Sequence, residues 1–134
     1  MIFSKRVFTW GGIFGLVMLT PMFFLESQMA AMGGPMTRPE NYYGFIGVAW
    51  AWQWVYLLIG SDPVRYRPIM PLGAMGKLIF VVITFGLAIA GRTPWNVALI
   101  TASDLVIAIL FLIAWRMTPV SPQGAIATGA EGPA

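Results

Sequence analysis

Four runs of apolar residues, each long enough to cross a lipid bilayer as an α-helix, constrain this chain more than any other feature. A spanning helix needs about 20 mainly apolar residues, and the runs cover residues 7–25, 42–60, 72–91 and 94–117. They do not alternate polar and apolar residues, as the strands of a membrane β-barrel would. We therefore predict an all-α polytopic membrane protein, a four-transmembrane-helix bundle that forms one domain over residues 1–118.

The composition of the chain also points to a membrane. Of its 134 residues, 58% are hydrophobic and 10% are charged, whereas a soluble domain carries about 25% charged residues. A water-soluble fold of this length leaves much of its surface exposed and could not hide so much apolar area. We expect the lipid bilayer as the partner of this surface. The net charge of +3 is then a matter of membrane topology, and no nucleic acid is expected.

Cysteine and histidine are both absent from the sequence. The lack of Cys excludes disulfide exchange, thiolate chemistry, iron–sulfur ligation and Cys-based zinc sites. The lack of His removes the most common general base and the most common haem or metal ligand. Phosphate-binding loops, dinucleotide-binding glycine motifs and nucleophile elbows are missing too. The sequence therefore predicts no catalytic residues and no cofactor, and it favours a protein that is not an enzyme.

Basic residues near the ends of the runs predict the orientation, because cytoplasmic loops carry an excess of Lys and Arg. With the N-terminus in the cytoplasm, five basic residues lie inside and two outside. Those inside are Lys5, Arg6, Arg65, Arg67 and Arg116, and those outside are Arg38 and Arg92. We therefore expect both termini in the cytoplasm. As an alternative, the first run is a cleaved signal peptide, although its apolar stretch exceeds the usual length of about 7–15 residues.

Proline and glycine predict several local features. Pro21 lies late in the first run, where it is expected to kink the helix, and Gly91 suits the C-terminal cap of the third. Residues 26–41 are expected to form the longest outer loop. The segment 119–134 is rich in Ala, Gly and Pro, and we predict a disordered cytoplasmic tail there.

Small residues recur at three- or four-residue spacing in three of the runs. Gly11 and Gly15 form a GxxxG pair in the first run. The other small-residue faces are Gly44, Gly47 and Ala51 in the second run and Gly86 with Ala90 in the third. Such faces let helix backbones approach closely in lipid. They predict packing within the bundle, with self-association through Gly11 and Gly15, or docking of other membrane subunits, as the alternatives.

Three polar residues lie inside the apolar runs, namely Gln53, Lys77 and Asp104. Counted from the outer ends of their runs at 1.5 Å per residue, they lie about 15–21 Å deep, close to one layer near the middle of the bilayer. We predict that Lys77 pairs with Asp104, with Gln53 nearby and Thr101 one turn away as a further hydrogen-bond partner. An ionisable residue in a membrane span is a functional candidate by default.

The same pair also has structural interpretations. Lys77 is close enough to the start of its run for its ammonium group to reach the cytoplasmic face. A Lys–Asp pair can also simply fix the register of two helices. Both interpretations stand beside a role in moving a proton, an ion or a substrate.

Two further groups of residues are candidates for ligand binding. Trp50 and Trp54 share one helix face, and their rings suit stacking on a quinone, a pigment or a sterol-like ligand, although such rings more often pack against other helices or lipid. Met29, Met32 and Met36 carry thioethers, which suit Cu(I). Without His or Cys they make a weak copper site, so no bound metal is expected.

Four stretches of the sequence carry a resemblance. They are PENYYGF (residues 39–45), AWAWQ (49–53), DPVRYRP (62–68) and DLVIAILFLIAWR (104–116). They resemble parts of small four-helix inner-membrane proteins of bacteria whose function is uncharacterised, and the general plan is similar to that of DoxX-like proteins. The resemblance implies a four-helix bundle in the bacterial plasma membrane and transfers no catalytic residues.

Three hypotheses follow for the function. The first is an accessory subunit or binding module of the membrane without enzymatic activity. The second is the protomer of a small transporter or channel that uses Lys77 and Asp104. The third is a membrane enzyme for a lipid-soluble substrate, with Asp104 as acid or base after burial has raised its pKa.

Overall fold

The computed structural model describes residues 1–33 and 35–122 of the chain. The described part contains helices and no strands. In chain order the elements are α1 (Ile2–Leu19), η1 (Thr20–Phe24), α2 (Glu26–Gly33), α3 (Pro39–Ser61), η2 (Arg67–Ile69), α4 (Met70–Ile89) and α5 (Trp95–Met117). The 3₁₀-helices η1 and η2 extend α1 and α4.

Four of the described helical segments are long and apolar enough to cross a membrane. They are Ile2–Phe24, Pro39–Ser61, Arg67–Ile89 and Trp95–Met117, each of 23 residues. At 1.5 Å per residue such a segment is about 35 Å long, which exceeds the hydrocarbon thickness of about 30 Å. The prediction of an all-α four-helix membrane protein is confirmed. The predicted tail lies mostly outside the described residues, because the description ends at residue 122.

The first three long helices begin earlier than the apolar runs predict, whereas α5 begins at Trp95, one residue later. The first begins at Ile2 instead of residue 7, because Lys5 and Arg6 are good helix formers whose long side chains reach water from a helix end. Pro39 starts α3 and Pro71 lies in the first turn of α4. Proline is tolerated there because the first N–H groups of a helix have no partner within it.

The segment after α1 differs from the expected loop. Regular α-helix ends at Leu19, and η1, which contains Pro21, continues it as a tighter 3₁₀-helix. Residues 26–33 then form α2 rather than a loop. Ala, Met, Gln and Glu in this segment are strong helix formers, and Glu26 at the start interacts favourably with the helix dipole.

The turn between α4 and α5 is closed as its glycine predicts. Gly91 has a φ of +70°, a conformation that L residues with a side chain rarely adopt. Its N–H donates to the carbonyl of Ala88 at 3.0 Å, and the N–H of Arg92 donates to the carbonyl of Leu87 at 2.9 Å. This pair of bonds is a Schellman motif, which satisfies carbonyl groups at the end of α4.

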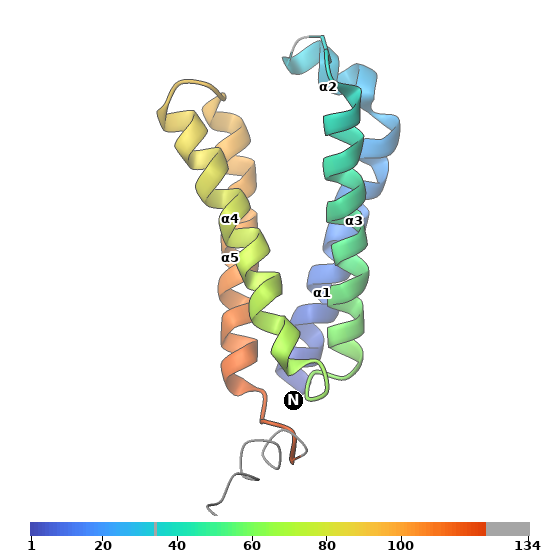
Figure 1. The fold of residues 1–134 in the computed structure, drawn as a ribbon, viewed down its shortest axis with the longest axis vertical. Helices are drawn as coiled ribbons and strands as arrows, with labels where there is room; N and C mark the ends of the chain where they lie inside the picture. Colours follow the sequence, from blue (N-terminus) through green and yellow to red (C-terminus); the bar gives the residue numbers. More distant parts are fainter. Residues whose placement is uncertain (34, 123–134) are drawn as a thin grey trace, which may run out of the picture.

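The four long helices form two hairpins that diverge. α1 packs along α3 and α4 packs along α5, with fewer contacts between the hairpins. Figure 1 shows the hairpins meeting near the N-terminus and separating towards the end that carries α2. We call residues 2–12, 53–77 and 104–118 the closed half, and residues 13–52 and 78–103 the open half.

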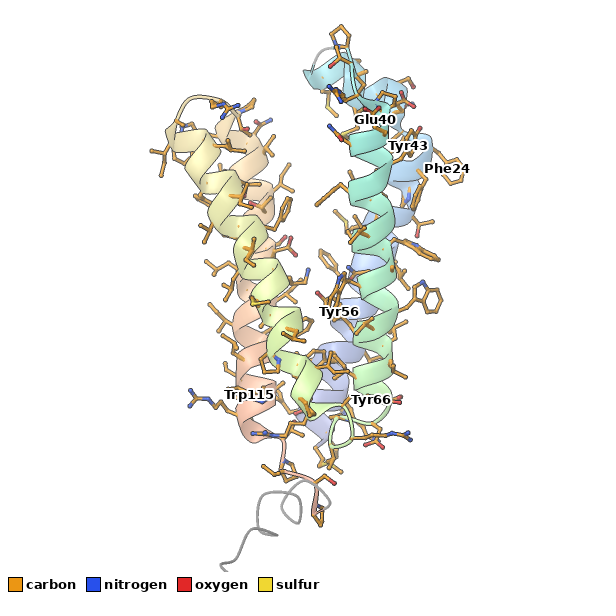
Figure 2. All side chains as sticks on the ribbon, viewed as in Figure 1. Phe24, Glu40, Tyr43, Tyr56, Tyr66 and Trp115 are labelled. Atoms are coloured by element: carbon orange, nitrogen blue, oxygen red, sulfur yellow. The ribbon has the colours of Figure 1, made fainter. Side chains whose placement is uncertain are left out.

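The hydrophobic core lies in the closed half and draws on all four long helices. Its centre is the pair Phe8 and Phe111, whose rings stack with centroids 4.1 Å apart and planes 13° apart. Tyr56 meets the Phe111 ring edge-on at 4.8 Å, and Figure 2 shows its side chain on the part of α3 that faces the other hairpin. The remaining buried members are Ile59, Met70, Ala74 and Ala114.

Polar contacts close the bundle below this core. Buried Ser4 donates a hydrogen bond from its hydroxyl to the carbonyl of Ala114 at 3.1 Å, and its Oγ lies 2.8 Å from the hydroxyl of Thr118. Arg67 donates from Nε to the carbonyl of Thr118 at 2.7 Å and lies over the ring of Trp115. These bonds satisfy carbonyl groups at the end of α5 and tie α1 and η2 to it.

Candidate functional site

An ion pair within the membrane-spanning part of the fold is the main candidate site. Lys77 on α4 donates from Nζ to Oδ1 of Asp104 on α5 at 2.5 Å. The side chains are 12% and 23% exposed, respectively, so the structure places the two charges in direct contact without enclosing them fully. The attraction offsets part of the cost of removing each charge from water.

The pair lies directly above the aromatic core, where the hairpins begin to separate. Nζ of Lys77 is 5.7 Å from the centroid of the Tyr56 ring on α3, a distance at which a cation is attracted to the ring face. The Tyr56 hydroxyl donates to the carbonyl of Gly73, one turn before Lys77, at 3.4 Å. Tyr56 thus brings the first hairpin into contact with the ion pair of the second.

The close approach at this point depends on a glycine. A Cβ atom on Gly73 would lie 2.9 Å from Cε1 of Tyr56, which is closer than real Cβ contacts. Because the Tyr56 ring is also held by Phe8 and Phe111, it has little room to move away. Gly73 therefore sets the distance between the hairpins beside the ion pair.

The ion pair leaves hydrogen-bonding capacity unused. Its contact within the described residues involves Oδ1 of Asp104 and one hydrogen of the Lys77 ammonium group. A carboxylate accepts through two oxygens and an ammonium group donates three hydrogens. Oδ2 and two ammonium hydrogens therefore remain for water or for another polar group.

Thr101 does not bond to Asp104 as expected. Its hydroxyl lies 2.8 Å from the hydroxyl of Thr84 on α4 and donates to the carbonyl of Ala98 within its own helix. Spacing along one helix suggested Asp104, but the packing of α4 against α5 places Thr84 opposite Thr101. The two threonines form a second, buried polar contact between these helices.

Gln53 also lies elsewhere than expected, in the interface between α1 and α3. Its Nε2 donates to the carbonyl of Ala49, and its Oε1 is buried without a hydrogen-bond partner among the described residues. The amide packs directly against Gly15, so that a Cβ on this glycine would collide with it. Gln53 thus packs against α1, whereas Tyr56, three residues later on α3, contacts Lys77. A common layer of Gln53, Lys77 and Asp104 stays a prediction.

The glycines of α1 pack against other helices of the same chain. Gly11 faces the ring of Phe111 on α5, whereas Gly12 and Gly15 face α3. This surface, considered for self-association, is therefore covered by the protein's own helices. By contrast, a Cβ on Gly44, Gly47 or Gly86 would meet no neighbouring atom within 4 Å.

The tryptophans considered for ligand stacking lie on the first hairpin. Trp50 and Trp54 meet edge-on with ring centroids 5.5 Å apart. The Nε1 of Trp50 donates to the hydroxyl of Thr20 in η1 at 3.1 Å, which ties α3 to the end of α1. Trp54 is exposed. Neither ring contacts the ion pair, and ligand stacking there stays a prediction.

The methionines considered for copper lie near α2. Met32 is exposed, whereas Met29 and Met36 are half-buried. Within residues 1–33 and 35–122, no group of three or more His, Cys, Asp or Glu side chains is placed to hold a metal ion. The weak Cu(I) option at these methionines stays a prediction.

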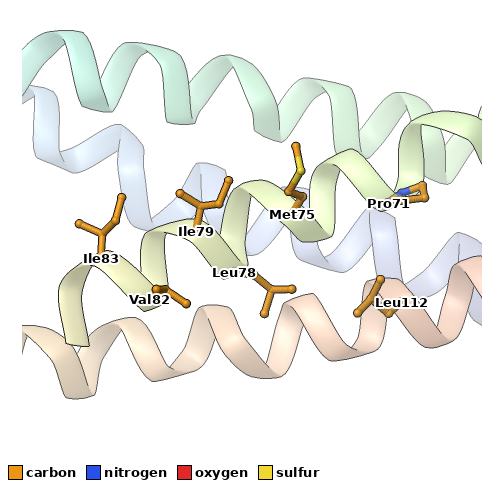
Figure 3. Close-up of a pocket in the computed structure, with 7 residues that line it drawn as sticks. All are labelled: Pro71, Met75, Leu78, Ile79, Val82, Ile83 and Leu112. Atoms are coloured by element: carbon orange, nitrogen blue, oxygen red, sulfur yellow. The ribbon is translucent and has the colours of Figure 1, made fainter. Parts of the chain in front are cut away.

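An apolar pocket lies on the face of α4 that points away from Lys77. It has a volume of about 340 Å³, and Met75, Ile79, Val82 and Leu112 are among its lining residues. Figure 3 shows that α4 provides most of this lining and that Leu112 reaches it from α5. No polar side chain takes part, so its surface suits the acyl chains of lipid rather than a reacting molecule.

Two residues near the site were not identified from the sequence. Tyr56 follows Gln53 by three residues, and Thr84 follows Lys77 by seven, which places each on the same helix side as a residue already singled out. This helical spacing could have indicated both residues from the sequence. It does not say which of several polar residues on a face meets which helix.

Comparison with known proteins adds no relative. No protein-family model, no curated protein and no solved structure matches this chain. The fold defines the class, a small multi-pass membrane protein with four apolar spans.

Proposed function

We propose that this protein is a non-enzymatic accessory subunit of a membrane complex, and that it binds a transmembrane helix of its partner beside the Lys77–Asp104 pair. The observation that carries the proposal is the unused hydrogen-bonding capacity of this pair. One oxygen of Asp104 and two hydrogens of Lys77 make no hydrogen bond within the described chain, and the Asp104 side chain is 23% exposed.

Lipid chains cannot satisfy these groups, because hydrocarbon offers neither donors nor acceptors. In membranes, Ser, Thr, Asn and Gln side chains of a neighbouring helix commonly supply such bonds. A partner helix with one such residue would complete the bonding of the pair. The surrounding surface is suitable, since Ile100, one turn from Asp104 on α5, is 68% exposed.

The proposal includes an orientation and a location. Lys5, Arg6 and Arg67 belong to the end of the fold where the hairpins meet, and an excess of basic residues marks the cytoplasmic side. We place both termini in the cytoplasm and the protein in the bacterial plasma membrane, with a plan like that of DoxX-like proteins. Because these 134 residues include no cysteine, single introduced cysteines at Ser61 and Arg92 test this directly. An impermeant thiol reagent added to intact cells should label position 92 and not 61.

Site-directed photo-cross-linking tests the subunit function. A photo-reactive amino acid replaces Ile100, on the face of Asp104, or Val106, on the opposite face of α5. These positions are 68% and 58% exposed, which makes them matched probes. Position 100 should cross-link to one protein of defined mass in native membranes, and position 106 should cross-link to lipid alone.

The charge dependence of the cross-link makes the test specific. Asp104→Asn, introduced beside the probe at position 100, should reduce the cross-link several-fold while expression and helix content stay unchanged. Equal cross-linking from positions 100 and 106, or a cross-link that ignores Asp104→Asn, would contradict the proposed docking.

Transport is the second candidate, because two ionisable groups in contact within a span can exchange a proton. The partial exposure of both side chains gives it support. Purified protein in liposomes with an internal pH-sensitive dye would show proton flux that Asp104→Asn abolishes. Flux at the level of empty liposomes would remove this candidate and leave the subunit proposal standing.

A further inference from the structure

A second pocket lies at the other end of the molecule, where η1, α2 and the start of α3 meet. It has a volume of about 350 Å³, and its lining includes Phe23, Phe24, Glu26, Met36 and Tyr43. Figure 2 shows Phe24 and Tyr43 at this end of the first hairpin, away from Tyr56. The pocket thus combines three aromatic rings, one thioether and one carboxylate.

The carboxylate of this pocket has no cation of its own. Glu26 accepts a hydrogen bond at Oε2 from the hydroxyl of Tyr43 at 2.6 Å. Among residues 1–33 and 35–122, the ion pairs are Arg38 with Glu40 and Lys77 with Asp104, and neither includes Glu26. Glu26 therefore presents negative charge to the pocket, and Tyr43 fixes its position.

The walls of the pocket are held by bonds to the rest of the hairpin. Tyr42 donates to the carbonyl of Met22 at 2.7 Å and meets the ring of Tyr43 edge-on at 5.2 Å. Phe23 meets the ring of Trp50 edge-on at 6.5 Å. Phe23 and Tyr43 are thus held in place before any ligand arrives, which lowers the entropy lost on binding. Phe24 is 83% exposed and adds its ring at the rim of the pocket.

We propose that this pocket binds an organic ammonium group. Aromatic faces attract such cations, and aromatic cages are a known means of binding choline and methylated amines. Glu26 adds a direct charge interaction and disfavours anionic groups. This inference does not depend on the proposed subunit function, because it concerns other residues at the other end of the first hairpin.

The position of the pocket suggests two sources for the ammonium group. Phe24 is the last residue of the first candidate span and is 83% exposed, and Tyr43 lies in the first turns of the second span. Aromatic residues at span ends lie at the level of lipid headgroups. The group can therefore belong to an ethanolamine or choline phospholipid, or to a free amine in the adjacent water.

Native mass spectrometry of the full-length protein in detergent tests the inference. After delipidation, the protein is mixed with equal amounts of phosphatidylethanolamine and phosphatidylglycerol, and the bound lipids are counted. The wild type should retain phosphatidylethanolamine in preference, and Glu26→Gln should reduce this preference by about 1.5- to fivefold, the range that an exposed ion pair contributes to an equilibrium. Equal retention of both lipids by the wild type, together with no binding of a free amine, would overturn the proposal.

Two control variants separate recognition from folding. Glu40→Gln removes an exposed carboxylate that pairs with Arg38 at 3.5 Å, and it should leave the lipid preference unchanged. Tyr43→Phe removes the hydrogen bond to Glu26 but keeps both the ring and the carboxylate, and it should keep most of the preference. If Glu40→Gln lowered the preference as much as Glu26→Gln, general surface charge would explain the effect and the pocket would not.

A second experiment distinguishes a phospholipid headgroup from a free amine as the source of the ammonium group. Tetramethylammonium is added to the delipidated protein, and contact is followed by saturation-transfer NMR on its methyl protons. A signal that Glu26→Gln weakens and Glu40→Gln does not would assign the pocket to free amines as well as to headgroups. Lipid preference without this signal would assign it to the phospholipid headgroup.

Discussion

The closed and open halves of this molecule contain the same four helices but are held together differently. In the closed half, Phe8, Tyr56 and Phe111 from three helices form one cluster, and Ser4 and Thr118 bond across the end of the bundle. In the open half, each helix packs on its hairpin partner, and contact between the hairpins includes the rings of Phe45 and Phe80, 5.2 Å apart. The Lys77–Asp104 pair marks the boundary between the two halves.

The difference shows what joins helices where lipid is the solvent. Apolar surface is abundant in both halves, yet lipid tails cover it as well as another helix does, so hydrophobicity alone does not draw helices together. The closed half adds stacked rings, the close approach at Gly73 and the hydrogen bonds of Ser4 and Thr118. Shape and hydrogen bonds therefore decide where the hairpins meet.

The largest effect is expected from removing an aromatic ring of the closed half. Phe111→Ala should destabilise the fold towards the lower end of the range of about 3–5 kcal/mol seen for Phe→Ala in packed cores, because lipid removes part of the hydrophobic contribution. Phe45→Ala, its counterpart in the open half, should change stability by less than about 1 kcal/mol. Steric-trap unfolding in bicelles measures both, and equal losses would break the distinction between the halves.

A smaller effect is expected at the boundary between the halves. Lys77→Met leaves the Asp104 carboxylate without its partner and should cost about 2 kcal/mol, less than in fully enclosed pairs because both groups are partly exposed. The double variant Lys77→Met/Asp104→Leu removes both charges and should recover stability to within about 1 kcal/mol of the wild type. Failure of the double variant to recover would show that the pair itself, and not the desolvation of a lone charge, stabilises the fold.

The smallest effect concerns two glycines of α4. Gly73→Ala places a methyl group 2.9 Å from the Tyr56 ring and should cost about 1 kcal/mol after the gain in helix propensity is subtracted. Gly86→Ala has open space around it and should be neutral or stabilise the helix by up to about 1 kcal/mol. The same unfolding assay measures the stability of both variants. If Gly86→Ala were the more destabilising, the tight contact between the hairpins would not lie at Gly73.

Much of this structure could be predicted from local properties of the sequence. The apolar runs predicted four spans because their length must match the bilayer, and Gly91 predicted its turn because its positive φ suits a residue without a side chain. Helix starts and α2 were less well predicted. Lys5 and Arg6 extend a helix as readily as they end an apolar run, and the helix propensity of residues 26–33 outweighed the polar, loop-like appearance of that segment.

The candidate site, too, was predicted only in part from the sequence. Lys77 and Asp104 stood out from sequence alone because charged residues are rare in spans, and depth along each helix brought them to similar levels. Gln53 and Thr101 satisfied the same depth rule and meet other partners, Gly15 and Thr84. Depth is a property of one helix, whereas a contact also needs the rotation of each helix about its axis.

By itself, the sequence determined the solvent, the number of spans and the rarity of charge within them, because each follows from the free energy of placing residues in hydrocarbon. Only the tertiary structure decided that the hairpins join over one half of their length, that Tyr56 is the contact between the first hairpin and the ion pair, and that Glu26 belongs to an aromatic pocket. These features depend on how side chains of separate helices fit together. Such fits are set by packing among distant residues, which no local pattern in the chain records.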